Sequence, residues 1–536
     1  MPTTPSPIIR NPVLPGSHPD PSIVRVGEDY YVATSTFEWS PGVRLHHSRD
    51  LVHWRDLGGA LDSTRLIDLA GVPDSGGVWA PNLSHADGLF HLVFSNVSAY
   101  LGGFSDCPNY LTTAPSVDGP WSDPVLLHAR GFDASLFHDG DESWLVNLVH
   151  DWQPGHGGSA GLEATRFDRV TRRLVGDPVL LALPPGGGWI EGPNLYRIGG
   201  WYYLVTADGG TGYDHQVTVA RSRELAGAYV RDPHGPLLTA RDHPDLPLQK
   251  AGHGSLVQTP GGEWYLAYLV GRPLGRHGPC ILGRETAIAP VVWSDDGWPR
   301  TRTGLPELEV PAPQPPVPSS APVATRGPLP GPEWSTLRRP ATSDWVLPAG
   351  DPTRLRVAGG RSPRSLVGPS LVARRVTGAR CSFEATLTYR PEQLQHLAGI
   401  TAYYSTRNWF FLHVTVDDDG RTVLRVASCD HGVVTLDEAG QVPLDQDGAD
   451  GLLLGLDLDG DRLQFRYATG AGWSAVGPVL DATVLSDEHA EEVHDGQTSA
   501  LGFTGAFVGL WVWDLTGGGL PAEFGDLAYR TRGDEA

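Results

Sequence analysis

The chain has very little of three residue types: its 536 residues include one methionine, one lysine and four cysteines. Cys107, Cys280, Cys381 and Cys429 are scattered along it. They have neither the close spacing of a metal site nor the density of a disulfide framework, which indicates a reducing compartment. We attribute the scarcity of lysine and methionine to genome composition, and it indicates nothing about function.

Long apolar runs are also absent. No stretch approaches the ~18 consecutive apolar residues of a membrane span. The first residues, MPTTPSPIIRNP, lack the charged and apolar regions of a signal peptide. We therefore expect a cytoplasmic protein without a membrane partner.

Positive charge is scarce as well. Forty lysines and arginines stand against 62 acidic residues, a formal net charge of -22. Nucleic acids and anionic membranes both require basic surface, so neither is expected as a partner. A neutral substrate fits this composition better. The length and the 40% hydrophobic content predict a folded chain of two domains.

The first 300 residues contain one pattern five times. Each copy has a polar or small residue, a short apolar run, a turn and an aromatic strand, which is typical of a β-hairpin. Successive copies start 60, 53, 58 and 62 residues apart, a period that suits the blades of a five-bladed β-propeller. The copies are HPDPSIVRVGEDYY, WAPNLSHADGLFH, FDASLFHDGDESW, IEGPNLYRIGGWYY and AGHGSLVQTPGGEW.

Equivalent positions of such repeats converge near the propeller axis. Here they are Asp20, Ala80, Asp133, Glu191 and His253. Three carboxylates and an imidazole in one cavity repel each other and are costly to desolvate, so chemistry explains them better than structure. Taken singly, each carboxylate could cap a turn or a strand, and the shared phase of the repeats decides against that reading.

The repeats stop at a proline-rich stretch. We expect a propeller over residues 1–305, a linker over 306–332 and a second domain over 333–536. The second domain alternates apolar and polar residues between turns, as in CSFEATLTY and GLWVWDLTG, and shows almost no helical periodicity. This pattern predicts an all-β chain in which a β-sandwich follows the propeller.

Nine segments in this order resemble glycoside hydrolase family 43: HPDPS, YYVATSTFEWSPGV, SRDLVHW, GVWAPNL, GFDASLF, IEGPNLY, GGTGYDH, AGHGSLV and LGRETAI. More narrowly, they resemble its intracellular β-xylosidases, in which a β-sandwich (concanavalin-like) domain follows a five-bladed propeller. The resemblance covers nearly the whole chain.

The resemblance implies a role for each carboxylate. Asp20 matches the general base that activates the attacking water, and Glu191 matches the general acid that protonates the leaving oxygen. Asp133 matches the third carboxylate, which orients the acid and keeps its pKa raised. The clustering argument agrees, because three adjacent carboxylates cannot all ionise cheaply near neutral pH.

The same resemblance implies a sugar pocket around these carboxylates. Aromatic walls and one forked guanidinium suit the apolar faces and equatorial hydroxyls of a pyranose. Aromatic strand residues are also common core residues, and this second reading stays open for Phe507 of TGAFVG, which would reach across from the second domain. The expected pocket residues are Phe37, Trp79, Ala80, Phe132, Thr211, His253, Arg284 and Phe507.

His253 is the one residue for which a metal is considered. In the family the matching histidine lies below the sugar, in some members near a cation or water. A core histidine is an equally good reading of the residue alone. No cofactor is required by the expected chemistry, and a calcium or other divalent ion near the propeller axis stays open.

The resemblance implies an exo-acting, inverting β-xylosidase that releases xylose from the non-reducing ends of β-1,4-xylo-oligosaccharides. Two alternatives remain. One is α-L-arabinofuranosidase activity, alone or beside the first, on an arabinoside substrate. The other is a non-catalytic sugar-binding propeller, which has no use for three converging carboxylates. The family also suggests a homo-oligomer.

Overall fold

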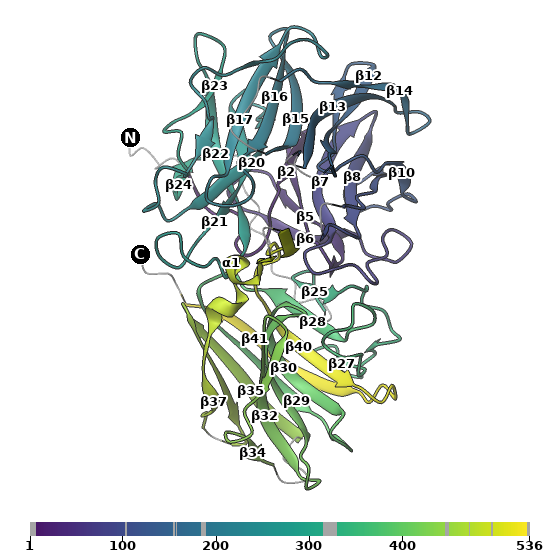
Figure 1. Ribbon diagram of the computed structural model, residues 1–536, viewed down its shortest axis with the longest axis vertical. Helices are drawn as coiled ribbons and strands as arrows, with labels where there is room; N and C mark the ends of the chain where they lie inside the picture. The colour runs from purple at the N-terminus through teal and green to yellow at the C-terminus, as the bar shows by residue number, and fades with distance from the viewer. Residues whose placement is uncertain are drawn as a thin grey trace, which may run out of the picture.

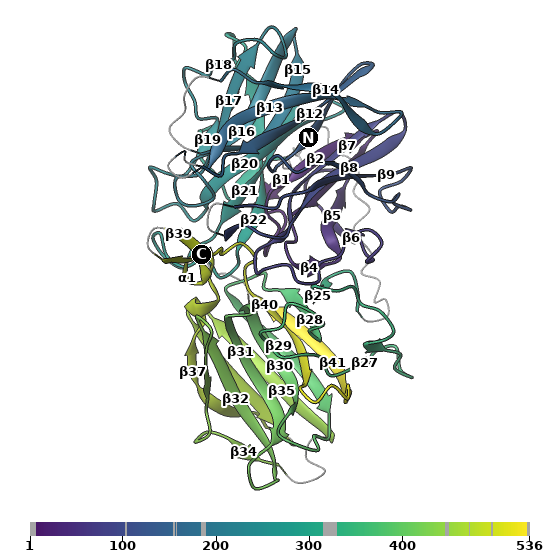
Figure 2. The same cartoon turned by 45° about the vertical axis from the view of Figure 1, so that its right-hand side comes forward.

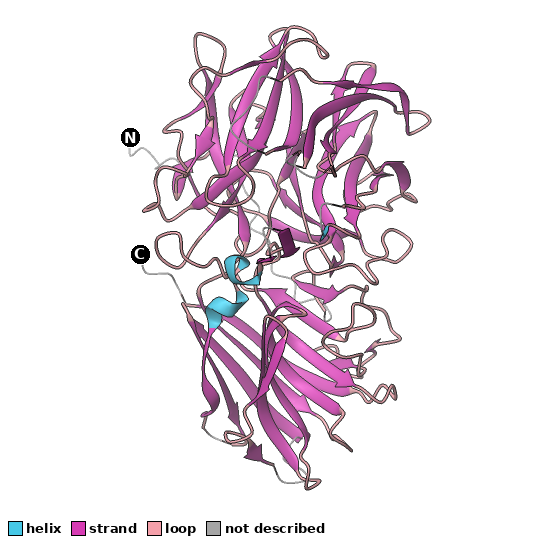
Figure 3. Cartoon of the chain, in the orientation of Figure 1, coloured by secondary structure: helices cyan, strands magenta, loops and turns pink. Residues whose placement is uncertain are grey.

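The computed structural model describes residues 7–101, 104–153, 156, 158–183, 189–314, 330–444, 450–470, 472–494 and 497–532. Two β-domains follow each other along the long axis, the N-terminal one above the C-terminal one in Figure 1. Strands make up most of both, as Figure 3 shows. Within the described ranges, no helix is long and apolar enough to cross a membrane.

The N-terminal domain is the expected five-bladed propeller, and each repeat forms the two inner strands of one blade. The first blade consists of β2 (Ser22–Val26), β3 (Asp29–Thr34), β5 (Gly42–Ser48) and β6 (Arg55–Leu61). The second consists of β7 (Gly77–Ala86), β8 (Leu89–Val97), β9 (Asn109–Ala114) and β10 (Val125–His128). The third is β11 (Ser135–Asp139), β12 (Glu142–His150), β13 (Ser159–Asp168), β14 (Arg173–Leu180). The fourth blade consists of β15 (Ile190–Ile198), β16 (Trp201–Asp208), β17 (Gln216–Ser222), β18 (Val230–Arg231) and β19 (Leu238–Thr239). The fifth consists of β20 (Gln249–Gln258), β21 (Trp264–Gly271), β22 (Arg284–Trp293) and β23 (Pro299–Thr301).

The turn chemistry of the repeats explains their hairpins. Ile198 pairs with Trp201, so Gly199 and Gly200 form a two-residue turn. Both glycines have positive φ, 58° and 77°, which is the backbone of a type I′ turn and matches the twist of the two strands. The Asp87–Gly88 turn of the second blade has the same signs, at 51° and 75°.

The ring is closed by contacts between the first and the last blade. β1 (Ile8–Arg10) pairs with β24 (Glu309–Pro311), so the two ends of the propeller are joined by their own small sheet. One buried apolar cluster contains Ile23 and Val32 of the first blade and Tyr265 and Ala267 of the fifth. This packing holds the inner strands in a circle and fixes where their first residues point.

The C-terminal domain is a β-sandwich of two sheets. The larger contains β4 (Trp39–Ser40), β25 (Trp334–Leu337), β28 (Leu371–Arg375), β40 (Phe507–Asp514), β30 (His396–Ser405), β31 (Asn408–Val416), β32 (Thr422–Asp430), β33 (Val433–Leu436) and β34 (Val442–Pro443). The smaller contains β26 (Val346–Leu347), β27 (Leu355–Val357), β41 (Ala522–Thr531), β29 (Arg380–Thr388), β35 (Asp450–Asp459), β36 (Arg462–Ala468) and β37 (Ser474–Asp481).

The larger sheet is buried on both faces. β30, β31 and β40 contain only buried residues, because one face packs in the sandwich core and the other against an aromatic cluster. That cluster includes Trp39, which belongs to the propeller part of the chain: β4 pairs with β25, with Leu337 opposite Trp39. The two domains thus share a sheet.

A short segment of the sandwich lies against the propeller. It contains the helices η2 (Ala482–Leu485) and α1 (Asp487–Ala490) and the two-stranded sheet of β38 (Glu492–His494) and β39 (Gln497–Ala500). Figures 1 and 2 both show α1 at the junction of the two domains. The expected linker over 306–332 stays a prediction, since residues 315–329 lie outside the described part.

Candidate active site

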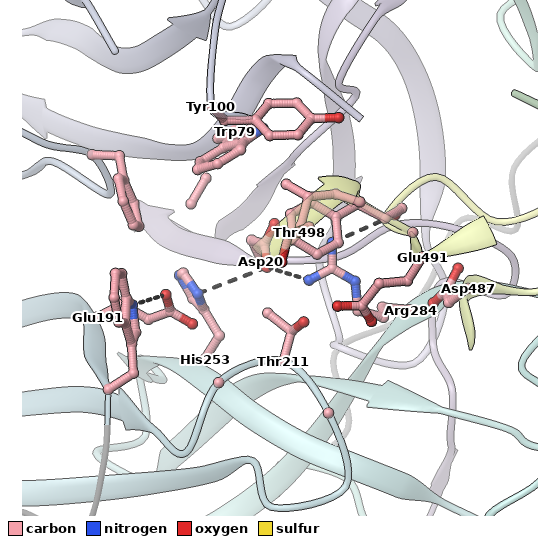
Figure 4. Close-up of a pocket in the computed structure, with 18 of the residues that line it drawn as sticks. Asp20, Trp79, Tyr100, Glu191, Thr211, His253, Arg284, Asp487, Glu491 and Thr498 are labelled. Carbon is pink, nitrogen blue, oxygen red and sulfur yellow. Dashed lines mark hydrogen bonds and ion pairs between the residues drawn. The ribbon is translucent and has the colours of Figure 1, made fainter. Parts of the chain in front are cut away.

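A cavity of about 690 Å³ opens where the propeller meets the segment around α1. Its floor and walls come from the inner strands of the blades, and its rim on one side comes from the sandwich. All the residues expected at the site line this cavity except Phe507. Figure 4 shows the arrangement of the labelled residues.

The repeats bring the three carboxylates together. Asp20 and Asp133 precede β2 and β11, and Glu191 lies in β15 just before a shift of register. Asp20 and Asp133 have φ of 57° and 55°, a left-handed backbone that costs energy outside glycine and is characteristic of functional sites. All three are more than nine-tenths buried.

Asp20 has a hydroxyl donor and two basic side chains around its carboxyl group. Ser35 Oγ donates a hydrogen bond to its Oδ2 at 2.6 Å. Its Oδ1 lies 3.7 Å from the Arg284 guanidinium and 3.7 Å from His253 Nδ1. These neighbours fix the position of the Asp20 carboxyl group in the cavity.

Glu191 has surroundings that favour the protonated form. Burial, and then the negative charge of Asp20, raise its pKa to about 7, against the opposing effects of Trp189 and Arg284. Trp189 Nε1 donates to Glu191 Oε2 at 2.8 Å, which fixes the carboxyl group in the cavity. A carboxylic acid with this pKa keeps its proton over much of the neutral range and can still release it.

Asp133 completes the cluster. The backbone N–H of Gly192 donates to its Oδ2 at 3.0 Å. Burial, followed by the charges of Glu191 and Asp20, raises the pKa of Asp133 well above its usual value. Because Asp133 and Glu191 repel each other when both are ionised, the two titrate as a pair, and the cluster retains a proton near neutral pH.

The expected wall residues surround these carboxylates. Trp79, Phe132 and Phe37 line the cavity together with Ala80 and Thr211. Trp79 meets Phe132 edge to face, with ring centroids 5.2 Å apart, and its Nε1 donates to the Ser75 carbonyl at 2.8 Å. The resulting wall presents rigid apolar surface to a ligand.

In Figure 4, Arg284 and Glu191 lie on opposite sides of Asp20. It is 2% exposed and lies at the start of β22. Its guanidinium carbon is 4.6 Å from the ring centroid of Phe503 and 5.6 Å from that of Phe37. The aromatic rings hold the guanidinium beside Asp20, where its N–H groups can meet ligand oxygens.

Phe507 does not line the cavity. It is 1% exposed and stacks on Trp39 with centroids 3.9 Å apart, inside the aromatic cluster of the larger sandwich sheet. The expectation that it reaches into the pocket is therefore wrong, because β40 is buried on both faces and turns Phe507 toward Trp39. Phe503, four residues earlier and outside the sheet, takes that place in the cavity.

His253 lies beneath the carboxylates. It has a φ of 45°, and a Cβ on Gly192 would approach its ring to 2.9 Å, so Gly192 allows this close packing. Burial lowers the pKa of His253, and the nearby Arg284 charge lowers it further while Asp20 opposes both, so the ring is neutral.

His253 belongs to no cluster of metal-ligating side chains among the described residues. Among the described residues, the cluster of potential metal ligands consists of Asp430, His431 and His489, and it lies on the sandwich. A cation at His253 thus stays a prediction.

The sequence analysis expected the sandwich to reach the cavity through Phe507 and did not predict the residues that do so. Lys250, the one lysine of the chain, is 4% exposed and forms an ion pair with Glu488 of α1. Its Nζ also lies 3.9 Å from Asp487 Oδ2. Burial, partly offset by the Lys250 charge, raises the pKa of Asp487 to about 6. The rim also contains Tyr100, Tyr213, Glu491 and Thr498.

These contacts had a weak signal in the sequence. Lys250 lies immediately before the fifth repeat, three residues before His253, and a single buried lysine requires an acidic partner. That partner lies more than 200 residues away in the second domain. No local pattern predicts which acidic residue it is.

Comparison with known proteins assigns both domains to one family. The model described as Glycosyl hydrolases family 43 matches residues 9–299, and the model described as Beta xylosidase C-terminal Concanavalin A-like domain matches residues 326–530.

Full-length relatives agree. The chain is 41% identical over 534 residues to Xylosidase/arabinosidase 43B of Humicola insolens, covering 98% of each protein. It is 38% identical over 542 residues to Beta-xylosidase of Bacillus subtilis (strain 168), covering 98% of this chain and 100% of the relative. The solved structure of xylan beta-1,4-xylosidase from Bacillus halodurans C-125 superposes with a TM-score of 0.92 at 43% identity, over 97% of this chain and 100% of that one. The chain therefore belongs to glycoside hydrolase family 43, with the concanavalin-like C-terminal domain of its β-xylosidases.

Proposed function

We propose that this enzyme is an exo-acting, inverting β-xylosidase that releases xylose from the non-reducing ends of β-1,4-xylo-oligosaccharides. The observation that carries the proposal is the contrast between two carboxylates in one cavity. Asp20 lies beside the Arg284 cation, whereas burial raises the pKa of Glu191 to about 7. Such a pair supplies a base and an acid at the same pH.

In the proposed reaction Asp20 acts on water. The carboxylate accepts a proton as the water oxygen attacks the anomeric carbon, and the new C–O bond forms on the face opposite the leaving group. Ser35 and Arg284 hold Asp20 in place, and Arg284 also binds sugar hydroxyls. Because water attacks directly, the configuration at the anomeric carbon is inverted.

Glu191 acts on the other side of the same bond. Its carboxyl group gives its proton to the glycosidic oxygen as the bond to the anomeric carbon breaks, so the leaving chain departs as a neutral alcohol. Trp189 fixes the carboxyl group by its hydrogen bond. Asp133 accepts a hydrogen bond from the backbone N–H of Gly192, the residue after Glu191, and so helps to orient the acid.

The sandwich accounts for the exo action. A propeller alone presents a cavity open at its end, through which an internal stretch of xylan would pass. Here Phe503, Asp487 and Glu488 cover one side of that cavity. Only the end of a chain enters a cavity of this form, so one sugar is released at a time.

An α-L-arabinofuranosidase activity of the same site is the second candidate. It is favoured by the name of the relative from Humicola insolens, which gives both activities. Hydrolysis of 4-nitrophenyl β-xyloside and 4-nitrophenyl α-L-arabinofuranoside, measured side by side, tests the assignment. We expect the xyloside to have the higher kcat/KM and Asp20→Asn to abolish both. A higher value for the arabinoside reverses the order of the two candidates, and no hydrolysis of either contradicts the proposal.

Two features beyond the site belong to the same proposal. The four cysteines are free and buried, which supports a reducing compartment and hence a cytoplasmic enzyme. The family supports a homo-oligomer. The proposed mechanism uses only side chains of this protein and water.

A further inference from the structure

A second cavity of about 420 Å³ adjoins the candidate active site. Ser105 and His150 line both cavities, so the two share part of their wall. The second cavity lies between the second and third blades, and none of its lining residues has a role in the reaction proposed above. The residues that line the second cavity are therefore available for a role other than catalysis.

Two exposed aromatic side chains mark this second cavity. Phe104 is 64% exposed and Trp152 is 57% exposed, and their rings stack on each other with centroids 5.6 Å apart and planes 19° from parallel. Large aromatic rings left in water are unfavourable, and neighbouring exposed ones are typical of binding sites. The pair comes from two loops, one after β8 and one after β12.

Both loops are held by hydrogen bonds. Asp106 N donates to the Ala99 carbonyl at 2.8 Å and so closes the loop that bears Phe104. Asp151 N donates to the Gly158 carbonyl at 2.9 Å, and the Asp151 carboxylate accepts from Gln153 N at 3.0 Å. The aromatic pair is thus preorganised, which lowers the entropic cost of binding.

The wall beside the proton donor leads toward the second cavity. Glu191 protonates the leaving oxygen, and Trp189, which holds Glu191, stacks on Phe132 with centroids 6.3 Å apart. The residue before Phe132 is Gly131, which lines the second cavity. The wall that holds the proton donor therefore continues into the lining of the second cavity, which also contains the aromatic pair.

We propose that Phe104 and Trp152 form an aglycone platform that binds the xylose units beyond the first leaving sugar. The proposal rests on the proposed β-xylosidase function. Xylose rings have apolar faces that pack on aromatic rings, while their hydroxyls need polar partners. Arg130, whose side chain is 54% exposed, lines the same cavity. Its Nε and Nη2 donate to the Glu163 carboxylate at 2.8 Å, which fixes the guanidinium and leaves its Nη1 for those hydroxyls.

The platform makes the enzyme sensitive to chain length. Xylobiose ends at the first leaving sugar and gains little from the platform, whereas xylotetraose places further rings on it. We expect wild-type kcat/KM to be higher for xylotetraose than for xylobiose. In Trp152→Ala and Phe104→Ala the ratio of the two values should fall about tenfold, the change produced by losing about 1.4 kcal/mol of contact.

The experiment compares kcat/KM for xylobiose and xylotetraose in wild type, both variants and a control. Trp473→Ala is the matched control, because Trp473 is also an exposed tryptophan (40%) but belongs to the sandwich. It should leave both values as in wild type. Calorimetric titration of the Asp20→Asn protein with the two sugars gives a second readout: the preference for xylotetraose in Kd should disappear when Trp152→Ala is added.

Three outcomes overturn the platform. They are equal kcat/KM values of wild type for the two sugars, an unchanged ratio in both variants, or the same change in the Trp473 control. None of these touches the proposed function, since xylobiose is cleaved in each case. Failure of wild type to cleave either sugar instead contradicts the proposed function itself.

Discussion

Replacing Phe503 by alanine removes an aromatic ring that the sandwich places over the candidate active site. The ring lies 4.6 Å from the Arg284 guanidinium carbon, 5.8 Å from the centroid of Phe37 and 5.9 Å from that of Trp79. A cation–π contact contributes about 0.5–2 kcal/mol and an aromatic pair about 0.5–1.5 kcal/mol. Part of this contact energy orders the side chains of the site before substrate binds and does not contribute to catalysis.

We therefore expect Phe503→Ala to cost about 1–3 kcal/mol of transition-state stabilisation, which lowers kcat/KM about 5- to 150-fold. Phe503 is only partly buried, so its loss should change Tm little. The assay measures xylobiose hydrolysis and thermal melting on the same preparations.

Phe507→Ala is the matched control, four residues along the chain. It removes a ring stacked at 3.9 Å on Trp39 in a packed core, which should destabilise the protein by about 3–5 kcal/mol and lower Tm. Its kcat/KM, measured well below Tm, should stay close to wild type. If instead Phe507→Ala lowers kcat/KM while Phe503→Ala does not, the reasoning about the two rings is refuted.

Three further predictions concern the proton donor and the domain junction. In Glu191→Ala, 2,4-dinitrophenyl β-xyloside, whose leaving group needs no proton, should lose far less rate than xylobiose; equal losses in steady-state assays would place the acid elsewhere. As pH rises through the pKa of Glu191, about 7, the acid loses its proton and kcat/KM falls. The hydrogen bond from Trp189 lowers this pKa, so Trp189→Phe should move the basic limb of the pH profile to higher pH. A shift of that limb to lower pH would contradict the assignment of Glu191 as the acid. Lys250→Met leaves Glu488 without its ion-pair partner and should lower the free energy of unfolding, measured in denaturant, by about 3–5 kcal/mol. Arg276→Met removes an exposed ion pair and should change the free energy of unfolding by less than about 1 kcal/mol. Equal effects of the two substitutions would mean that the domain junction does not depend on Lys250.

The repeats made the propeller and the floor of the site predictable. An offset of 11 residues from Asp20 to Tyr31 recurs in every copy, and the blades are built from those hairpins. Equivalent residues of a closed ring must converge. The position of Asp133 beside Glu191 thus followed from spacing alone, before any geometry was known.

The residues that the sandwich contributes to the cavity were not predictable in the same way. Whether Phe503 or Phe507 faces the cavity depends on where β40 begins and on which neighbours cover each face of its sheet. β40 is buried on both faces, so its sequence shows no alternation that would distinguish them. The contact of Lys250 with Glu488 joins two domains across more than 200 residues, and only the packed structure determines it.

The anomeric form of the first sugar released tests the central claim most directly. If Asp20 activates water and Glu191 protonates the leaving oxygen, hydrolysis of 4-nitrophenyl β-xyloside inverts the anomeric carbon, and proton NMR in the first minutes of turnover should show α-xylose before mutarotation. Initial formation of β-xylose from this substrate would contradict the account, because it requires a covalent intermediate and a nucleophile in place of the water.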